Sequence, residues 1–522
     1  MLKRRLSVII LILLVFALGV YDLENQPSPW FDEGWVLSLA RNWVFSGHYG
    51  HFLQGEPVPS TILNAGFPVI LPIALGFRFL GLGIWQGRIP SVFFLVLICS
   101  LLYHLAYRLY GHKVGLWTLI FAFLSPMYLD LHLLIMGRQA LGEISGTCYL
   151  LAGFVVLQHA SGRRKYLIPI SAFLFSLALQ AKPQFLPFFL VSLLIPFMLL
   201  LLKRQKQYQQ FIVLILLTLG FGQLMSWGWS FVARPLVSGK TSSGDPYAMV
   251  WDLSVFFTYV AVLKPLVRLN VLRNFLITLT GLPVFVGLVY YAAKCVPMIL
   301  SDSRWNREQI SISVLILWGF SFSWFCWFVF LSIGFLRYLF PGLLVGGILA
   351  GYAFYALTLE LDFGALLRLL AFNIHTHRIN GESILRFFVL VLLLIASVTT
   401  LRSFSGISVS SQKSPYTAVL EFLNTRTDPD ALIETYESEL FLFLDRDYHY
   451  PPDSIQHVLN RRFFLGEDLP LVYDPTEIGI DYLVIGWSKF WGLYDTMLNS
   501  GHFELVYRNS RYDVYQRITA EK

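Results

Sequence analysis

Asp32 and Glu33 are adjacent carboxylates that follow an apolar N-terminal run, in the stretch WFDEGWVLSLARNWVFSGHYG. Ionisable side chains beside a membrane are costly, so this pair needs a chemical or a structural reason. A carboxylate can act as a general base in a reaction. An Asp or Glu at the start of a helix can instead cap that helix and favour its dipole. Both explanations are open from position alone.

Further ionisable side chains are expected at the same ends of the apolar segments. Carboxylates and cations gathered at one membrane face suit a reaction in which a base takes a proton while cations hold an anionic leaving group. A guanidinium can hold such an anion through two hydrogen bonds. The additional candidates are Arg88, Asp130, His132, Arg138, Glu143, Lys182 and Arg337.

The composition decides the class of protein that must position these groups. Of 522 residues, 56% are hydrophobic and only 14% are charged, and the mean hydropathy is +0.62. Such a chain is a membrane protein. The net charge of +7 reflects Lys and Arg in short loops that orient membrane helices, and we expect no nucleic-acid partner. The four cysteines lie in apolar segments without metal spacing, and His48 and His51 are weak metal candidates.

Apolar runs near the ~18 to 20 residues that span a bilayer predict about eleven transmembrane helices. Basic clusters at 3–5, 162–165, 203–207 and 304–307 all fall on one side, which predicts a cytoplasmic N-terminus. Loops 23–88 and 233–273 and everything after 405 are then on the outer face. The predicted spans are 6–22, 89–110, 113–130, 140–160, 166–181, 184–202, 211–232, 274–299, 309–335, 338–358 and 385–404.

The outer segments have patterns of their own. After Asp32, the apolar residues Val36, Leu39, Ala40, Trp43 and Val44 recur at helical spacing, which predicts an amphipathic helix lying in the membrane interface.

The C-terminal part is more polar than the rest of the chain. A linker at 405–415 precedes a predicted helix at 417–426, short strands at 431–435 and 481–486, and a hairpin at 503–518. The fold class is therefore mainly α and polytopic, with a transmembrane domain at 1–404 and a small α/β outer domain at 405–522.

Several stretches, in chain order, resemble one superfamily. FDEGWVLSLARNWVFSGHYG is similar to the first external loop of the dolichyl-phosphate-mannose protein mannosyltransferases and the ArnT-like glycosyltransferases of the GT-C fold. GFPVILPIALGFRFLGLGIWQGRIPSVFF, LSPMYLDLHLLIMGRQALGE and RYLFPGL resemble later helices and loops of the same proteins, and IETYESELFLFLDRDYHYPPD resembles the outer domain of some bacterial members. The resemblance covers most of the chain and rests on order and topology.

The resemblance implies roles for particular residues. Asp32 would be the catalytic base, with Glu33 beside it orienting the acceptor or a metal. Glu143 would orient the site. No cofactor is certain, no metal ligand is assigned, and a divalent metal is left open. The residues that would bind the donor phosphate are Arg138, Lys182 and Arg337.

The resemblance and the chemistry together predict an inverting glycosyltransferase of the bacterial inner membrane. It would move a sugar from a polyprenyl-phosphate donor to a lipid, glycan or protein acceptor at the outer face, among membrane lipids. Direct attack with one base predicts inversion, whereas retention would need Glu33 as a nucleophile. No GxxxxGK[ST] loop and no strand-GxGxxG-helix unit occurs, which disfavours an ATPase or a nicotinamide enzyme.

Three alternatives remain from the sequence. A transporter or flippase of lipid-linked glycans also needs cations and many spans, but it predicts charges at mid-membrane depth and internal repeats. An O-antigen ligase or polymerase would rely on an external loop rich in Arg and His. A relative that only binds a lipid-linked sugar would be expected to lack Asp32.

Overall fold

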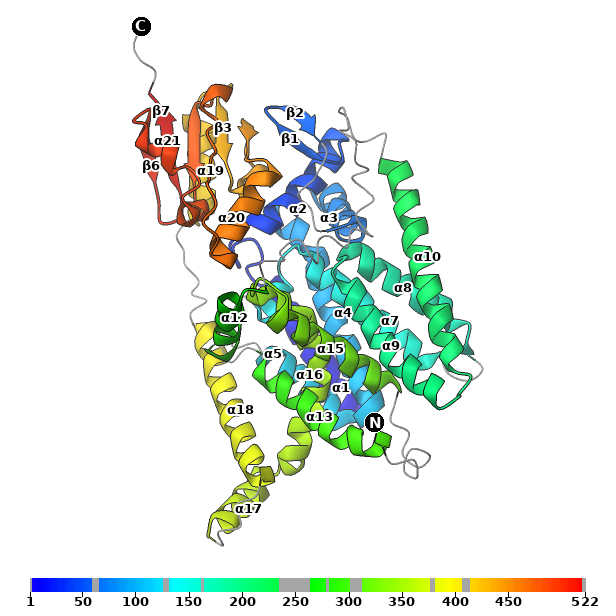
Figure 1. Cartoon of the computed structure of the whole chain (residues 1–522). Coiled ribbons are helices and arrows are strands. Elements are labelled where there is room, and N and C mark those ends of the chain that lie inside the picture. Colours follow the sequence, from blue (N-terminus) through cyan, green and yellow to red (C-terminus); the bar gives the residue numbers. More distant parts are fainter. Residues whose placement is uncertain are drawn as a thin grey trace.

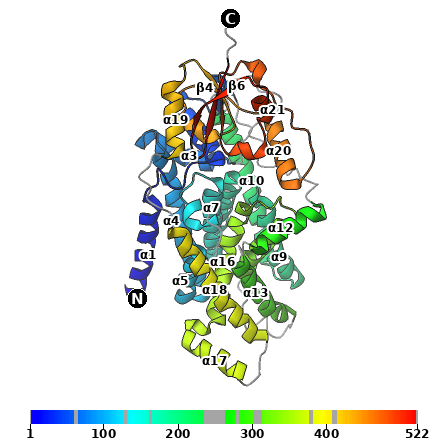
Figure 2. The same cartoon turned by 90° about the vertical axis from the view of Figure 1, so that its left-hand side faces the viewer.

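The computed structural model describes residues 2–58, 65–124, 131–160, 164–233, 263–277, 281–300, 312–375, 381–405 and 414–518. A bundle of long helices forms one part. The C-terminal residues 414–518, which contain the small sheet and which we call the cap, lie at one end of the bundle (Figure 1). The N-terminus lies toward the opposite end of the bundle from the sheet, in both views (Figures 1 and 2). Asp130, one of the candidate residues, lies outside the described residues.

Each of the eleven predicted spans overlaps a helix, and residues 125–130, 278–280 and 309–311 of three of the spans lie outside the described residues. A run of apolar residues inside a bilayer must satisfy its backbone internally, and the helix does so. Within the described part of the chain, six helices are long and apolar enough to cross a membrane by length and composition, among them α4, α9 and α16. The helices are α1 (Leu2–Val20), α4 (Ile84–Tyr110), α5 (His112–Leu124), α7 (Gly142–His159), α8 (Leu167–Ala181), α9 (Phe185–Leu202), α10 (Tyr208–Ala233), α13 (Leu282–Leu300), α15 (Ile312–Phe330), α16 (Phe340–Leu357) and α18 (Gly381–Ser405).

Close helix pairs hold the bundle together. The most extensive contacts join α7 to α8, α8 to α10, α13 to α16 and α9 to α15. Where α13 meets α16 the backbones touch, because a Cβ on Gly287 would lie 2.6 Å from the backbone of Ala350. Small residues permit such approaches in membrane bundles. Beyond α16, the short helix α17 (Phe363–His375) lies at the end of the molecule away from the cap (Figures 1 and 2).

The first outer loop folds into protein and not onto a lipid surface. It contains α2 (Phe31–Arg41), a π-helical turn (Asn42–Ser46), the hairpin β1 (His51–Leu53) and β2 (Glu56–Val58), and α3 (Phe67–Leu80). The predicted amphipathic helix exists, but its placement in the membrane interface was wrong. Val36, Leu39 and Ala40 are buried in a core that α2 shares with α3 and the C-terminal residues, because a partner segment from the far end of the chain covers them.

The C-terminal part is a mixed five-stranded sheet with helices around it. The strands are in the order β4-β3-β5-β7-β6, with β3 parallel to β4 and β5 and the other pairs antiparallel. The predicted helix, the two strands and the hairpin are all confirmed. The division at residue 404 stays a prediction, and residues 406–413 lie outside the described ranges. The elements are α19 (Pro415–Arg426), β3 (Leu432–Thr435), η9 (Ser438–Leu442), β4 (Asp447–His449), α20 (Asp453–Leu465), β5 (Tyr482–Ile485), η11 (Trp487–Trp491), α21 (Asp495–Asn499), β6 (Phe503–Arg508) and β7 (Asp513–Arg517).

Three short helices complete the site region. These are α6 (Leu133–Met136) before α7, η7 (Leu336–Leu339) before α16, and α12 (Pro265–Ile277), which begins inside the predicted second outer loop. The part of that loop at 234–262 lies outside the described residues.

Candidate functional site

Four charged side chains meet where the helix bundle touches the cap. Asp32 lies in the first turn of α2, Glu143 in the first turn of α7, Lys182 at the C-cap of α8 and Arg337 in η7. We call these four residues the ion-pair cluster. All of them are at helix ends on the side of the bundle that carries the cap, as the sequence predicted.

Local sequence sets where each helix ends. Pro183 follows Lys182 and disfavours helical geometry in the residue before it, so Lys182 is extended and α8 stops there. Pro341 lies in the first turn of α16, a position that suits its fixed φ, and Arg337 precedes it on η7. The N-cap of α2 is Trp30, without a side-chain cap hydrogen bond. The capping explanation for Asp32 was therefore wrong, although Asp32 still lies at the positive end of the helix dipole.

The cluster alternates anions and cations. Arg337 donates from Nη2 to the Asp32 carboxylate. Its Nε lies 3.4 Å from Oε1 of Glu143, and the same oxygen accepts a hydrogen bond of 3.0 Å from Lys182 Nζ. The side chains of Arg337, Glu143 and Lys182 are buried, but that of Asp32 is 38% exposed. Within the cluster Asp32 is thus the carboxylate that solvent or a substrate can reach.

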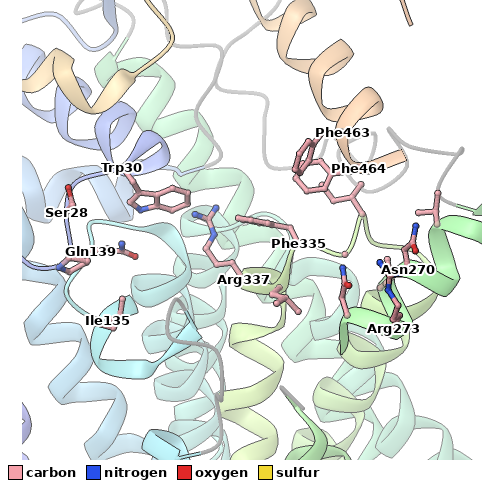
Figure 3. A pocket seen from close by; sticks show the side chains of 17 residues that line it. Ser28, Trp30, Ile135, Gln139, Asn270, Arg273, Phe335, Arg337, Phe463 and Phe464 are labelled. Carbon is pink, nitrogen blue, oxygen red and sulfur yellow. The ribbon is translucent and has the colours of Figure 1, made fainter. Parts of the chain in front are cut away.

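A cavity of about 570 Å³ adjoins the cluster. Its walls come from the segment before α2, the loop after α6, α12, residues 333–337 and α20 of the cap. Figure 3 shows Arg337 between the rings of Trp30 and Phe335, with Phe463 and Phe464 of α20 above the cavity. The volume is in the range of small-molecule sites. Of the four cluster residues, Arg337 is the one that lines it.

Arg337 carries unused hydrogen-bonding capacity at this wall. Its Nη1 is buried and has no hydrogen-bond partner among the described residues, whereas Nε faces the Glu143 carboxylate. The guanidinium carbon lies 4.5 Å from the ring centre of Trp30 and 5.3 Å from that of Phe335, so two aromatic faces hold its plane. A buried donor without a partner is costly. An anion in the cavity would satisfy it.

Glu33 points away from Asp32 into a separate buried pair. Arg88 donates from Nε to Oε1 at 2.8 Å and from Nη2 to Oε2 at 2.6 Å, and both side chains have no exposed area. Glu33 Oε1 also accepts from the backbone N–H of Ala140 at 2.9 Å, while Arg88 donates to the carbonyl of Leu23. Glu33 therefore ties α2 to α4 and to the loop just before α7.

No family model and no curated protein sequence matches this chain. Among the solved structures that match, two cover nearly the whole chain. The crystal structure of ArnT from Cupriavidus metallidurans in the apo state has a TM-score of 0.56 and 14% identity, covering 98% of this chain and 97% of that one. The same protein bound to undecaprenyl phosphate gives 0.57 and 13%, covering 99% and 98%.

The chain has the ArnT fold. Identity this low establishes the fold alone, and the roles of individual residues stay predictions. The ArnT fold agrees with the predicted fold class, a polytopic helical protein with a small C-terminal sheet, and with the GT-C resemblance of the ordered stretches.

Within the ArnT fold of this chain, other candidates lie apart from the cavity wall. Arg138 donates from Nη2 to the carbonyl of Tyr21, and burial lowers the pKa of Arg138 to about 10, with the nearby Arg88 charge as a further cause. His132 accepts from the backbone N–H of Leu134 at 3.2 Å and acts as the N-cap of α6. Neither residue lines the cavity.

The structure adds no support for a metal site at His48 and His51. His48 Nε2 lies 3.2 Å from the carbonyl of His51 and 3.1 Å from that of Val58, which are backbone partners within the loop. Burial, with the His48 charge as a second cause, lowers the pKa of His51 to about 3. Among the residues that the structure describes, no group of three or more His, Cys, Asp or Glu is arranged to hold a metal.

Sequence reasoning missed most of the cavity in this ArnT fold. Trp30 and Phe335 lie close to Asp32 and Arg337 in sequence, and an aromatic residue near a candidate cation is a usable signal. Arg273 on α12 and the pair Phe463–Phe464 on α20 carry no such signal. They reach the cavity because distant segments fold over it.

Proposed function

We propose that this protein is a membrane glycosyltransferase of the GT-C type. It transfers a sugar from a polyprenyl-phosphate donor to the hydroxyl of a lipid, glycan or protein acceptor. Asp32 acts as the base and Arg337 binds the donor phosphate, with Lys182 and Glu143 behind it. The reaction takes place at the outer face of a bacterial inner membrane, with the N-terminus cytoplasmic and the cap outside. The ArnT fold supports this assignment.

One observation carries the proposal. The guanidinium of Arg337 binds an accessible carboxylate, Asp32, through Nη2 and faces Glu143 through Nε, while Nη1 has no hydrogen-bond partner within the described part of the chain and Arg337 lines the cavity. A phosphate bound there would lie beside the base, as a transfer reaction requires. Arginine suits phosphate because its donors are arranged in a planar fork.

The chemical step follows from this arrangement. The Asp32 carboxylate takes the proton of the acceptor hydroxyl as its oxygen bonds to the anomeric carbon. The bond between that carbon and the phosphate oxygen breaks, and both electrons leave with the phosphate. Arg337 stabilises the charge that develops on the leaving group. A positioned base typically contributes about 10² to 10⁴-fold, and removal of one electrostatic donor typically costs about 10² to 10³-fold.

The state of Glu33 favours inversion. A retaining reaction needs a second carboxylate that can attack the anomeric carbon. Glu33 is fully buried and both of its oxygens are occupied by Arg88, while Glu143 is buried beneath Arg337. Asp32 is therefore the one carboxylate of these three that is open to a substrate, which supports direct displacement.

The donor lipid fits the site by chemistry. A polyprenyl phosphate has an apolar tail that belongs in the bilayer and a charged head at its surface, and the cluster lies at the ends of apolar helices. In one matched structure, ArnT from Cupriavidus metallidurans is bound to undecaprenyl phosphate. We extend that ligand class to this chain as part of the proposal.

The transporter alternative is less well supported. It predicts charged residues at mid-membrane depth. The ion-pair cluster instead gathers at helix ends beside the cap. A single-face site is what a transfer between a membrane lipid and an outer acceptor requires.

The test is transfer of label by the full-length protein in proteoliposomes. The substrates are radiolabelled polyprenyl-phosphate sugars and a total envelope extract as the source of acceptor. Asp32→Asn should lose about 10² to 10⁴-fold in rate. Glu24→Gln, which changes an exposed carboxylate shortly before α2, is the matched control and should transfer at the wild-type rate. Equal turnover by wild type and Asp32→Asn would refute the base assignment.

A second readout separates the two classes of function. The same proteoliposomes report whether labelled lipid crosses the membrane. Movement of the intact lipid-linked sugar at equal rates in wild type and Asp32→Asn, with no transfer from any donor, would favour the transporter.

A further inference from the structure

The segment that carries Asp32 is held by the C-terminal hairpin. Arg511, in the turn between β6 and β7, donates from Nη1 to Ser28 Oγ at 2.8 Å and to the carbonyl of Pro29 at 3.0 Å. Its Nη2 donates to Glu439 Oε1 at 2.5 Å. One planar group thus joins the hairpin, η9 and the chain just before α2, and the fork geometry fixes their relative positions.

A second contact fixes α2 itself. Ser438 Oγ donates to the carbonyl of Phe31 at 2.5 Å. A Cβ on Gly34 would lie 2.3 Å from the backbone nitrogen of Glu439, so the backbones of α2 and η9 touch. Asp32 lies in the chain between Phe31 and Gly34, two residues of α2 that contact η9. A shift of α2 along η9 would break both contacts.

The positions of η9 and α2 depend on Arg511 because Arg511 neutralises the buried carboxylate of Glu439. Its side chain is completely buried, and Oε1 accepts hydrogen bonds from Arg511 and from the hydroxyl of Tyr512 at 2.9 Å. A buried carboxylate that loses its cation is left uncompensated and forces its surroundings to adjust. Here the surroundings are η9 and, through it, α2.

We propose that Arg511 is a positioning residue for Asp32, and that the C-terminal hairpin is thereby part of the catalytic apparatus. The inference rests on the proposed function, because it assigns Arg511 to the geometry of the base. Arg511 touches no substrate. It acts by holding residues 28–34 so that the Asp32 carboxylate meets the Arg337 guanidinium at the wall of the cavity.

The test compares Arg511→Gln with wild type in proteoliposomes, by transfer kinetics and by amide hydrogen exchange of the peptide that covers residues 28–35. We expect kcat to fall about 10 to 100-fold while the KM for the lipid donor changes less than about twofold, because a small displacement of a catalytic group lowers turnover. Exchange in the peptide should rise about tenfold as its anchoring is lost.

Two further variants serve as controls. Arg508→Gln is the matched control, because Arg508 lies on the same hairpin and donates to Asp513, away from α2; kcat and exchange should stay at wild-type values. Arg511→Lys keeps a cation for Glu439 without the fork, so it should fold and give an intermediate kcat even if Arg511→Gln does not fold.

A double variant distinguishes the positioning of Asp32 by Arg511 from a general loosening of the structure. In an Asp32→Asn background, Arg511→Gln should lower the residual rate no further, since the base through which it acts is gone. Additive losses would overturn the proposal, as would unchanged exchange in Arg511→Gln or raised exchange at an unchanged kcat. Absence of transfer by wild type would contradict the proposed function instead, and the exchange data would still decide whether Arg511 anchors the segment.

Discussion

The buried pair between Glu33 and Arg88 gives the sharpest quantitative prediction. Arg88 donates three hydrogen bonds, two to Glu33 and one to the Leu23 carbonyl, and neither charged side chain has exposed area. Arg88→Met removes the cation and leaves the Glu33 charge buried. Breaking a buried pair in this way costs about 3 to 5 kcal/mol. We expect the free energy of unfolding to fall by that amount.

The assay is reversible unfolding in mixed micelles by titration with sodium dodecyl sulfate, followed by tryptophan fluorescence. The double variant Glu33→Gln with Arg88→Met removes both charges and should regain part of the lost stability, because no ion is then left unpaired. Lys113→Met is the control, since the Lys113–Glu360 pair is about two-thirds exposed and solvent screens it.

Two results would refute this reasoning. A loss below about 1 kcal/mol in Arg88→Met would mean that water or another group compensates Glu33. A Glu33→Gln variant with wild-type stability and a much lower kcat would return Glu33 to the chemistry, as the sequence had left open.

Three more predictions follow from the site and the cap. Arg337→Lys keeps the charge but loses the planar fork, so kcat/KM for the lipid donor should fall about 10²-fold in the transfer assay, and an unchanged value would remove Arg337 from the phosphate site. Gly34→Ala should lower the free energy of unfolding by about 1 to 3 kcal/mol, because its Cβ would overlap η9; Gly347→Ala, with open space around it, is the control. Burial, with the Glu439 charge second, raises the pKa of Glu437 from 4.5 to about 7. Between those values the folded protein binds a proton that the unfolded chain has lost, so stability should fall as pH rises through this window, and Glu437→Gln should flatten the dependence.

The membrane helices could be predicted because a physical rule applies to each one separately. A span needs a long apolar run and satisfies its own backbone, so no knowledge of its neighbours is required. The elements of the cap followed from alternation and turn signals in the same local way. Pro183 also indicates where α8 ends, and Pro341 indicates where α16 begins.

Contacts between distant segments could not be predicted. The periodicity after Asp32 indicates that one face of α2 is covered, but it does not say by what, and the cap covers it where a lipid surface was expected. Glu33 and Arg88 were both candidates, yet nothing in a single sequence pairs them. Phe463 and Phe464 form the upper wall of the cavity only because α20 folds over it.

The shared core of α2 and the cap has a consequence for biosynthesis. The hydrogen bond from Ser438 to Phe31 joins residues 407 positions apart. A ribosome that adds about 5 to 20 residues per second needs about 20 to 80 s to make the second partner after the first. Throughout that interval the part of α2 that packs on η9 has no protein surface to cover it, although α3 is already made. The surroundings of the proposed base are therefore completed last, when the end of the chain arrives, and a truncated or prematurely released chain carries Asp32 on a helix that lacks its contacts with the cap.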